Sequence, residues 1–306
     1  MLVVGAKGFE PSTLWSQTRC ATRLRYAPTP RILTAGWCLA LCWDDIFPKR
    51  TRVRNPGMQA PRPVLPWLDP GAPFPAAGTA WGADTDAPGL LAAGGDLSVQ
   101  TLLRAYAGGI FPWFSQGQPI LWWSTDPRMV LHVAEFKLHR SLRKSLQKFV
   151  ASGDCDIRFD TDFVAVIEAC AGSARRGAPG TWIQPAMVQA YCDLHAAGRA
   201  HSVEVWQAGS LVAGLYCVAR GRAVFGESMF TTVPDASKIA LAALVGFCRY
   251  HGVVMVDCQQ NTQHLASLGA REIARAAFLT HVDNAMAYPE LDWRFDTLYW
   301  KCVAAL

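Results

Sequence analysis

The stretch RAVFGESMFTTVPDASKIALAALVGFCRYHGVVMVDCQQNTQHLASLGA, residues 222–270, decides the fold of the chain. It predicts a strand over Arg222–Phe230, an amphipathic helix over Ala236–His251 and a second strand over Val253–Gln259. The second strand begins with four consecutive apolar residues, which is typical of a strand covered on both faces. A tight segment, Leu265–Ala270, closes the stretch.

Polar side chains gather where the two predicted strands end. Because residues alternate across a strand, we expect Asp257 and Gln259 on one face of the second strand. The same alternation places Phe225, Glu227 and Met229 on one face of the first strand. If the strands are neighbours, two carboxylates and an amide meet beside an apolar wall, and this arrangement predicts a site.

Capping residues mark the ends of the expected helices. Asp235 is the expected N-cap of the helix in residues 222–270, and Gly252 follows its last turn. Nearer the N-terminus, a helix around Val99–Tyr106 has Ser98 or Asp96 as its cap. Alternating residues and turn dipeptides predict an antiparallel meander of three strands, His201–Trp206, Leu211–Ala219 and Arg222–Phe230.

The composition limits the class of protein. The chain has 306 residues, 51% hydrophobic and 17% charged, which suffices for one large or two modest globular domains. Its ten cysteines form no CxxC pair, which indicates reduced thiols and a cytoplasmic protein rather than disulfides or zinc. The seven histidines show no metal-ligand spacing, and no apolar run approaches the ~20 residues that span a bilayer. We therefore expect no metal, no cofactor and no membrane partner.

The first 57 residues differ from the rest of the chain. They hold nine of the 29 Lys and Arg and three of the 24 Asp and Glu, so the remainder carries 20 basic and 21 acidic residues. The net charge of +5 therefore does not by itself indicate a nucleic-acid partner. Gly8–Pro11 back-translates to a sequence that includes GGTTCGAACC, which is typical of a tRNA T-arm. We hypothesise that residues 1–57 are read-through of an upstream tRNA gene and that Met58 is the natural start; a disordered extension is the alternative.

A small N-terminal domain, residues 58–126, is expected to precede the main domain, residues 127–306, with the boundary at Asp126-Pro127. The segment GIFPWFSQGQPILWWS, Gly109–Ser124, holds five aromatic residues near this boundary. Clustered aromatics are usually core; the alternative is a platform on which a base or adenosine stacks. Gly180–Ile183 is a second loop that carries an aromatic residue.

Lys137–Phe149 predicts the clearest amphipathic helix of the chain. Its apolar face holds Leu138, Leu142, Leu146 and Phe149. Its opposite face is basic and holds Lys137, Arg140, Arg143, Lys144 and Lys148. Because acidic residues are absent from this face, ion pairs within the helix do not explain it. A solvated surface and a contact with a phosphate backbone remain as interpretations.

Nine motifs occur in the order seen in leucyl/phenylalanyl-tRNA–protein transferases. They are LLAAGGDLS (Leu90–Ser98), GIFPWFS (Gly109–Ser115), PILWWSTDPR (Pro119–Arg128), GTWI (Gly180–Ile183), AHSVEVW (Ala200–Trp206), GESMF (Gly226–Phe230), ASKIAL (Ala236–Leu241), DCQ (Asp257–Gln259) and LASLGAREI (Leu265–Ile273). From about Leu90 to Phe278 the chain resembles this family, whereas residues 1–57 and the final tail do not.

The resemblance implies an α+β fold with a GNAT-like acyltransferase domain behind a small N-terminal domain. It implies an enzyme that moves Leu, Phe or sometimes Met from an aminoacyl-tRNA to the N-terminal Arg or Lys of a protein. Such a transfer marks the product for degradation through the N-degron pathway. The implied partners are an aminoacyl-tRNA and proteins with N-terminal Arg or Lys.

The resemblance also implies roles for individual residues. Tyr106, Trp113 and Trp182 are expected to hold the 3′ adenosine of the tRNA. The aminoacyl side chain is expected to enter an apolar pocket that includes Leu215, Val224, Leu244 and Val256. Cys217 departs from the family pattern, because a glycine is usual at this place.

The proposed chemistry is aminolysis of an activated ester. The attacking α-amine has an ordinary pKa of about 7.7–8.0, so a strong base is not required. Gln259 is a poor base alone, and the family mechanism has Asp257 polarise its amide through a hydrogen bond. In the alternative, both residues position the substrates and the proton goes to the tRNA ribose or to water. Glu227 suits the cationic side chain of the acceptor, because a carboxylate matches a guanidinium; a structural ion pair is its alternative.

Two other classes of protein compete with this interpretation. An acetyl-CoA-dependent N-acetyltransferase needs a Gly-rich turn at the start of the helix, but Thr231–Asp235 has no glycine, and Pro234 lacks an amide donor. A non-catalytic RNA-binding module fits the basic helix and the aromatic loops. It leaves Glu227, Asp257 and Gln259 unexplained.

Overall fold

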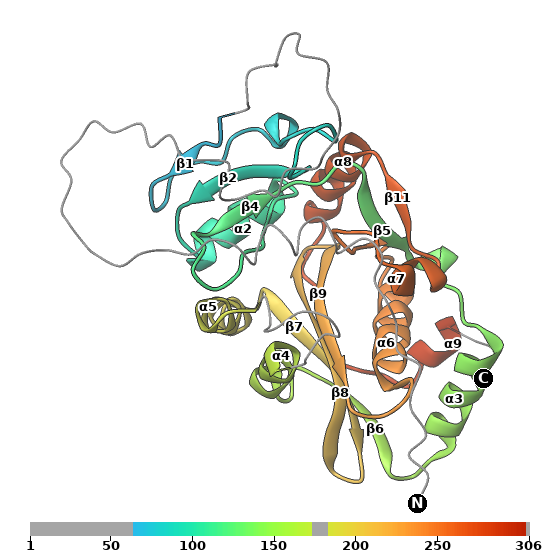
Figure 1. Cartoon of the computed structure of the whole chain (residues 1–306). Helices are drawn as coiled ribbons and strands as arrows, with labels where there is room; N and C mark the ends of the chain where they lie inside the picture. Colours follow the sequence, from blue (N-terminus) through green and yellow to red (C-terminus); the bar gives the residue numbers. More distant parts are fainter. Residues whose placement is uncertain (1–63, 173–182, 304–306) are drawn as a thin grey trace, which may run out of the picture.

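A computed structural model describes residues 64–172 and 183–303 (Figure 1). The predictions for residues 1–57, and that for Trp182, lie outside this part of the chain. The described residues form two sheets and the helices around them, which confirms the α+β class. Among them, no helix is both long enough and apolar enough to cross a membrane.

A seven-stranded mixed sheet forms the centre of the main domain. In chain order its strands are β5 (Arg128–His132), β6 (Cys155–Phe159), β7 (Ala200–Gln207), β8 (Ser210–Arg220), β9 (Ala223–Thr231), β10 (Met255–Asp257) and β11 (Arg271–Ile273). The strands lie in the order β11-β5-β10-β9-β8-β7-β6, and all neighbours are antiparallel except β9 and β10. The predicted meander is confirmed as β7, β8 and β9.

Helices cover both faces of this sheet (Figure 1). One face carries α4 (Phe163–Gly172) and α5 (Pro185–Ala196), and the other carries α3 (Arg140–Ala151), α6 (Ala236–Tyr250) and α9 (Tyr299–Val303). α6 is buried over most of its length because it contacts the sheet, α3 and α9. The sheet therefore separates two hydrophobic clusters, one on each face.

A second sheet lies in the N-terminal part of the chain, at the upper left of Figure 1. Its strands β1 (Trp67–Leu68), β2 (Leu90–Gly94), β3 (Phe111–Pro112) and β4 (Leu121–Trp123) lie in the order β1-β2-β4-β3, beside the helix α2 (Val99–Ala107). Ser98 caps α2, because its side chain accepts a hydrogen bond from the Thr101 N–H. Trp122 and Trp123 are buried, so much of the aromatic segment is core, as the first of the two interpretations holds.

The strands β9 and β10 run in parallel and are joined by α6. Their pairing ends at Asp257, which lies opposite Phe225. Beyond this point the Cys258 N–H donates to the Met129 carbonyl at 2.9 Å, while β9 continues along β8. The chain after β10 therefore follows β5, and β9 and β10 diverge. This divergence makes room for the cavity described below.

The chain after Ala270 contains elements that the sequence pattern does not predict. A short helix, α7 (Gln263–Ser267), precedes it, and α8 (Arg275–Met286) and α9 follow. Trp293 and Trp300 are buried in the cluster around α6. The C-terminal tail thus completes the core. The sequence pattern does not predict α9 because this helix is too short to show a helical period.

Two predicted element boundaries are wrong. The basic helix begins at Arg140 and not at Lys137, because the backbone of His139, with φ −58° and ψ 155°, is not helical. The second strand of residues 222–270 covers only β10, and Val254 before it is 56% exposed. The apolar run is therefore not covered on both faces along its whole length.

Asp235 precedes α6 but does not cap it. Its φ of 63° lies in the left-handed region, and its side chain accepts no capping hydrogen bond from a backbone N–H of the first turn. Its carboxylate accepts instead from Lys238 Nζ at 2.8 Å and from Ser145 Oγ at 2.9 Å. Asp235 therefore links α6 to α3, while Gly252 ends the helix as predicted, with a φ of 70°.

Gly246 permits the close approach of α9 to α6. A Cβ at this position would lie 2.7 Å from the Tyr299 carbonyl oxygen and 2.9 Å from Val303 Cγ2. Although alanine favours a helix by about 1 kcal/mol, we expect Gly246→Ala to lower the free energy of unfolding by about 1–3 kcal/mol through overpacking. Urea denaturation measures this change. Gly153→Ala, in the turn before β6, is the control: no atom of residues 64–172 and 183–303 lies within 4 Å of its added Cβ, so it should not destabilise, and equal losses would contradict the packing explanation.

Candidate active site

A cavity of about 380 Å³ lies where β9 and β10 diverge. Side chains from the N-terminal part, β8, β9, α6, α7 and the turn after β10 form its walls. Most of the wall is apolar, and its polar part includes the carboxyl groups of Glu227 and Asp257 and the amide of Gln259. A concave, mostly apolar cavity with a few convergent polar groups is the usual form of a small-molecule site.

Glu227 is the extra residue of a β-bulge in β9. Gly226 pairs with Cys217, and Ser228 pairs with Tyr216, so two residues of β8 face three of β9. A bulge bends the strand and redirects the side chain at that point. It also reverses the alternation between the residues before and after it.

The expected shared face of Phe225, Glu227 and Met229 is therefore wrong. Phe225 packs in the cluster on the α5 side of the sheet, whereas Met229 packs against the cluster on the α6 side. The bulge inserts one residue between them, so a strand period of two no longer relates their side chains. Glu227 is thereby directed into the gap between the diverging strands.

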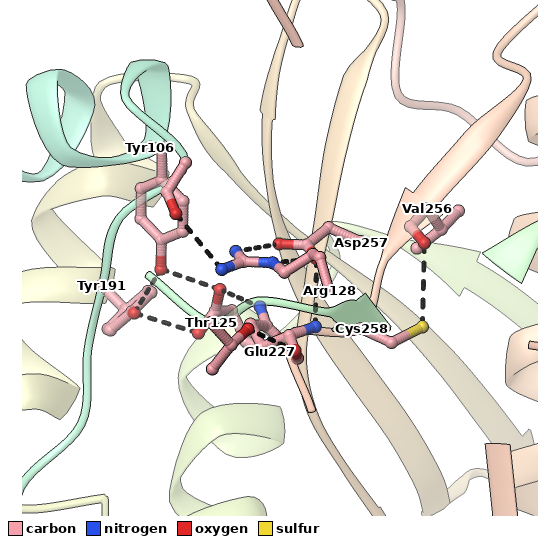
Figure 2. Close-up of polar contacts among 10 residues, drawn as sticks. Tyr106, Thr125, Arg128, Tyr191, Glu227, Val256, Asp257 and Cys258 are labelled. Carbon is pink, nitrogen blue, oxygen red and sulfur yellow. Dashed lines mark hydrogen bonds and ion pairs between the residues drawn. The ribbon is translucent and has the colours of Figure 1, made fainter. Parts of the chain in front are cut away.

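Three side chains lie within hydrogen-bond distance of Glu227. Its Oε1 accepts from Gln259 Nε2 at 3.2 Å and lies 2.8 Å from the Tyr106 hydroxyl oxygen. Its Oε2 lies 3.0 Å from the Tyr191 hydroxyl oxygen, and the two tyrosine oxygens are 2.5 Å apart (Figure 2). The carboxylate is thus fixed from α2, from α5 and from the turn after β10.

Burial raises the pKa of the Glu227 carboxyl to about 7, because surroundings of low dielectric disfavour its charge. The hydroxyls of Tyr106 and Tyr191 oppose this effect, and the charge of Asp257 adds to it. Burial, together with the charge of Glu227, raises the pKa of both tyrosines well above 10. The tyrosines therefore remain donors, and Glu227 changes its charge near neutral pH.

Arg128 holds Asp257 in a bidentate ion pair (Figure 2). Arg128 Nη2 lies 2.6 Å from Oδ2 and Nε lies 2.8 Å from Oδ1, and both side chains are 1% exposed. The guanidinium carbon lies 4.8 Å from the ring centre of Phe111 and 4.6 Å from that of Phe278. Asp257 is therefore a fixed negative charge that Arg128 neutralises, and the pair is costly to break.

Gln259 lies in the turn after β10, with a φ of 52° in the left-handed region. Its N–H donates to Asp257 Oδ1 at 3.0 Å, and its carbonyl accepts from Thr125 Oγ1 at 3.0 Å. The expected hydrogen bond between the side chains of Gln259 and Asp257 is wrong: Asp257 binds the Gln259 backbone, and the Gln259 amide binds Glu227. The turn ends the strand alternation on which that expectation depended.

Three of the four expected aminoacyl-pocket residues line the cavity. They are Leu215, Leu244 and Val256. Val224 does not line it, because it pairs with Val256 before the strands diverge and is 2% exposed. The apolar wall also includes Met229, Leu241 and Leu265.

The predicted adenosine-binding aromatics differ in their positions. Trp113 lines the cavity, and its ring packs edge-on against Trp123 with centroids 5.5 Å apart. The Tyr106 ring is 3% exposed and packs against Phe225, so it offers no face on which a base could stack. That expectation for Tyr106 is corrected: its hydroxyl positions Glu227. Trp182 lies outside the described residues.

The basic side chains of α3 and of the segment before it are exposed. They are Lys137, Arg140, Arg143, Lys144 and Lys148. The segment adjoins α7, because His139 Nε2 lies 2.6 Å from the Ser267 carbonyl oxygen. Since α7 lines the cavity, the basic surface and the cavity lie on connected parts of the molecule.

A second buried carboxylate, Glu204 on β7, has a structural role. Its Oε1 accepts from Thr161 N–H at 2.9 Å, Asp162 N–H at 2.8 Å and Ser202 Oγ at 2.8 Å. Its Oε2 accepts from Trp206 Nε1 at 2.9 Å. Each contact has its own donor hydrogen, and the group joins β7 to the start of α4. Within residues 64–172 and 183–303, no group of three His, Cys, Asp or Glu side chains could hold a metal ion.

The sequence predictions missed Arg128, Tyr191 and Thr125. They lie on β5, on α5 and in the segment after β4, far from the predicted strand ends. Arg128 had a usable signal, because it directly precedes the apolar run Met129–Leu131 and such a charge needs a partner when buried. Tyr191 has no such signal, since its position within a helix pattern is also typical of core.

The sequence is similar to the family described as "Leucyl/phenylalanyl-tRNA protein transferase" over residues 130–283. Residues 95–126 are similar to the family described as "Leucyl/phenylalanyl-tRNA protein transferase N-terminal domain". The two matches together cover most of the described chain.

Curated relatives named "Leucyl/phenylalanyl-tRNA--protein transferase" align along nearly their whole length. That of Polaromonas sp. (strain JS666) is 63% identical over 241 residues, 79% of this chain and 94% of the relative. That of Albidiferax ferrireducens is 59% identical over 244 residues, 80% of this chain and 96% of the relative. A solved structure of L-PGS from Bacillus licheniformis matches weakly, with 12% identity, 55% of each chain covered and a TM-score of 0.30, and supports no conclusion.

The raised pKa of Glu227 predicts a pH-dependent cost to stability. Because the folded-state pKa of about 7 exceeds the ordinary 4.5, the unfolded chain loses this proton first as the pH rises. The free energy of unfolding should therefore fall between pH 4.5 and 7 and level off above 7. Glu227→Gln removes the titration, and its stability relative to the native chain should grow by about 2–3 kcal/mol between pH 5 and 8 in urea denaturation. A constant difference across this range would contradict the assignment.

Proposed function

The chain belongs to the leucyl/phenylalanyl-tRNA–protein transferase family, and on this premise we propose that it moves Leu or Phe from an aminoacyl-tRNA to the N-terminal Arg or Lys of an acceptor protein. The aminoacyltransferase activity follows from the family; the acceptor residues and the roles of the side chains are the proposal. The observation that carries it is an apolar cavity with a carboxylate, Glu227, in its wall. The product is a protein tagged for degradation through the N-degron pathway.

The aminoacyl side chain of the donor occupies the apolar part of the cavity. Leu215, Leu244 and Val256 supply this wall, with Met229 and Leu241 beside them. A volume of about 380 Å³ accepts a leucyl or phenylalanyl group beside a second reactant. An apolar pocket separates side chains that differ by one methylene by only ~1–3 kcal/mol, so Leu, Phe and Met are all expected as donors.

Glu227 binds the cationic side chain of the acceptor. Its carboxyl group lines the cavity and contacts three side chains, while a carboxylate offers about four lone-pair positions. The remaining position is open to a guanidinium or ammonium group. A charge-assisted hydrogen bond in low dielectric favours such a cation over a neutral side chain.

The reaction itself is attack of the acceptor α-amine on the ester carbonyl. Holding the two groups together supplies on the order of 7–11 kcal/mol of the barrier. Gln259 lies beside Glu227, and its amide is placed to contact the reacting centre. Asp257 accepts a hydrogen bond from the Gln259 backbone N–H. It therefore fixes the position of the Gln259 side-chain amide and does not polarise it directly.

The tRNA contacts two regions on this proposal. Trp113 stacks on the 3′ adenosine at the cavity, and Trp182 is proposed as its partner on grounds of the family resemblance. The exposed basic side chains of α3 and Lys137 contact the phosphate backbone. The cavity adjoins α7, which lies next to this basic surface, so one tRNA can reach both.

A transfer assay tests the proposal directly. The purified protein, Leu-tRNA and a peptide with N-terminal Arg should yield leucyl-peptide without coenzyme A. Glu227→Ala should raise the KM for this peptide at least tenfold with little change in tRNA affinity, because it removes a charge-assisted contact of about 1.5–3 kcal/mol. Gln259→Ala should instead lower kcat with little change in tRNA affinity. Unchanged kinetics in both variants would refute the assignment of this cavity as the active site.

The basic surface predicts a salt-dependent contact. Replacing Arg140 and Lys144 with Gln should weaken tRNA binding and reduce the slope of log Kobs against log salt by about 1 per lost phosphate contact. Filter binding between 50 and 200 mM salt, about the range in which such contacts respond, measures the slope. Arg220→Gln is the control, since this exposed residue ends β8 and does not lie on α3. An equal change in the control would indicate a general charge effect.

A further inference from the structure

Two tyrosine side chains form a closed ring of polar contacts with Glu227. Tyr106 and Tyr191 approach each other to 2.5 Å through their hydroxyl oxygens. Tyr106 lies 2.8 Å from Glu227 Oε1, and Tyr191 lies 3.0 Å from Oε2 (Figure 2). All three distances are those of O–H···O hydrogen bonds, so each contact requires one hydrogen.

The two tyrosines cannot supply three hydrogens. A phenol carries one hydrogen, so the ring holds two when Glu227 is ionised. The 2.5 Å contact between the tyrosines is at the short end for a hydrogen bond and must contain one of them. One contact to Glu227 would then place lone pairs against each other. A protonated Glu227 carries the third hydrogen and fills the ring.

Gln259 does not replace this hydrogen. Its Nε2 donates to Oε1 at 3.2 Å, in a contact additional to the three of the ring. The carboxylate of Glu204 shows the contrast, because each of its four contacts comes from a different donor. Glu204 therefore needs no proton of its own, although it is 0% exposed.

The charges that face Glu227 also favour its neutral form. Arg128 on β5 is the nearby cation, and Asp257 on β10 neutralises it through two hydrogen bonds. Cys217 on β8 faces Glu227 as a thiol, whose pKa burial raises well above 9. The tyrosines from α2 and α5 complete the surroundings as neutral groups. The pKa of about 7 for Glu227 agrees with the hydrogen count of the ring.

We infer that Tyr106, Tyr191 and Glu227 hold one carboxyl proton in the free protein and release it to solvent when the cationic end of the acceptor binds. The inference rests on the proposed role of Glu227 in acceptor binding. In the step, the carboxyl O–H bond breaks, the proton passes to the buffer, and an N–H of the guanidinium or ammonium group donates to the carboxylate. One contact of the ring then opens, because two hydroxyl hydrogens remain.

This exchange avoids an unpaired charge at the site in both the free and the occupied state. The free site holds a neutral acid, and the occupied site holds a carboxylate with a cation, so an unpaired charge is never buried. An acceptor with a neutral N-terminal side chain does not displace the proton. The ring therefore contributes to selection of Arg and Lys over neutral side chains, in addition to the attraction of opposite charges.

Infrared spectroscopy tests whether the free protein holds the carboxyl proton. The difference between native protein and Glu227→Gln should contain a carboxylic-acid C=O band at pH 6, about halved near pH 7 and nearly absent at pH 8. Glu204→Gln is the matched control and should leave this band unchanged. Absence of the band at pH 6 would overturn the inference.

Calorimetry tests whether acceptor binding releases this proton to solvent. The probe is a peptide whose N-terminal arginine lacks its α-amine, so that the guanidinium, which does not titrate, is the group that binds Glu227. Titrations in buffers of different ionisation enthalpy should show release of about 0.9 proton at pH 6 and about 0.1 at pH 8. Binding without proton release at pH 6 would overturn the inference and leave the proposed function standing. Equal binding by Glu227→Gln would instead refute the acceptor site, and the infrared band would still decide whether the free protein holds the proton.

Discussion

The buried ion pair between Arg128 and Asp257 is the interaction on which the site depends. It joins the first residue of β5 to the last residue of β10, at the point where β10 leaves β9. Both side chains are 1% exposed, so removal of either partner would leave an unpaired charge in the core. Arg128 also donates to the Gly109 carbonyl at 3.2 Å, which ties the N-terminal part of the chain to the same place. The pair therefore fixes the turn at Gln259 and the mouth of the cavity together.

Two buried carboxylates, Asp257 and Glu204, and the half-buried Glu227 are stabilised in three different ways. Asp257 has a cation, and Glu204 has four donors, each with its own hydrogen. Glu227 has neither a cation nor enough hydrogens for all of its contacts, and it faces a cavity. A carboxylate in this position gains most from a ligand that brings positive charge. The structural difference among the three explains why acceptor binding is assigned to Glu227.

The site is built from elements that are distant in the sequence. α2 and α5 contribute the two tyrosines, β5 contributes Arg128, and the bulge in β9 directs Glu227 between them. The strand pattern predicted that Glu227, Asp257 and Gln259 would meet at the strand ends, and the structure brings them together. It also changes what they do, because Asp257 contacts the backbone of Gln259 and the Gln259 amide contacts Glu227. The predicted polarising contact between Asp257 and the Gln259 side chain is replaced by a positioning one.

The sequence by itself determined the meander, the helix α6 and the apolar wall, because each has a local period or a capping signal that short-range physics imposes. Tertiary structure alone decided the bulge at Glu227, the left-handed turn at Gln259 and the burial of the Tyr106 ring. Each depends on contacts between residues far apart in the chain, such as the Thr125 hydroxyl on the Gln259 carbonyl. A one-residue bulge leaves no trace in an alternating pattern, yet it reverses every side chain beyond it. For this reason the sequence could predict that Glu227, Asp257 and Gln259 belong to the site, but not how their side chains are paired or which distant residues, Arg128, Tyr191 and Thr125, join them.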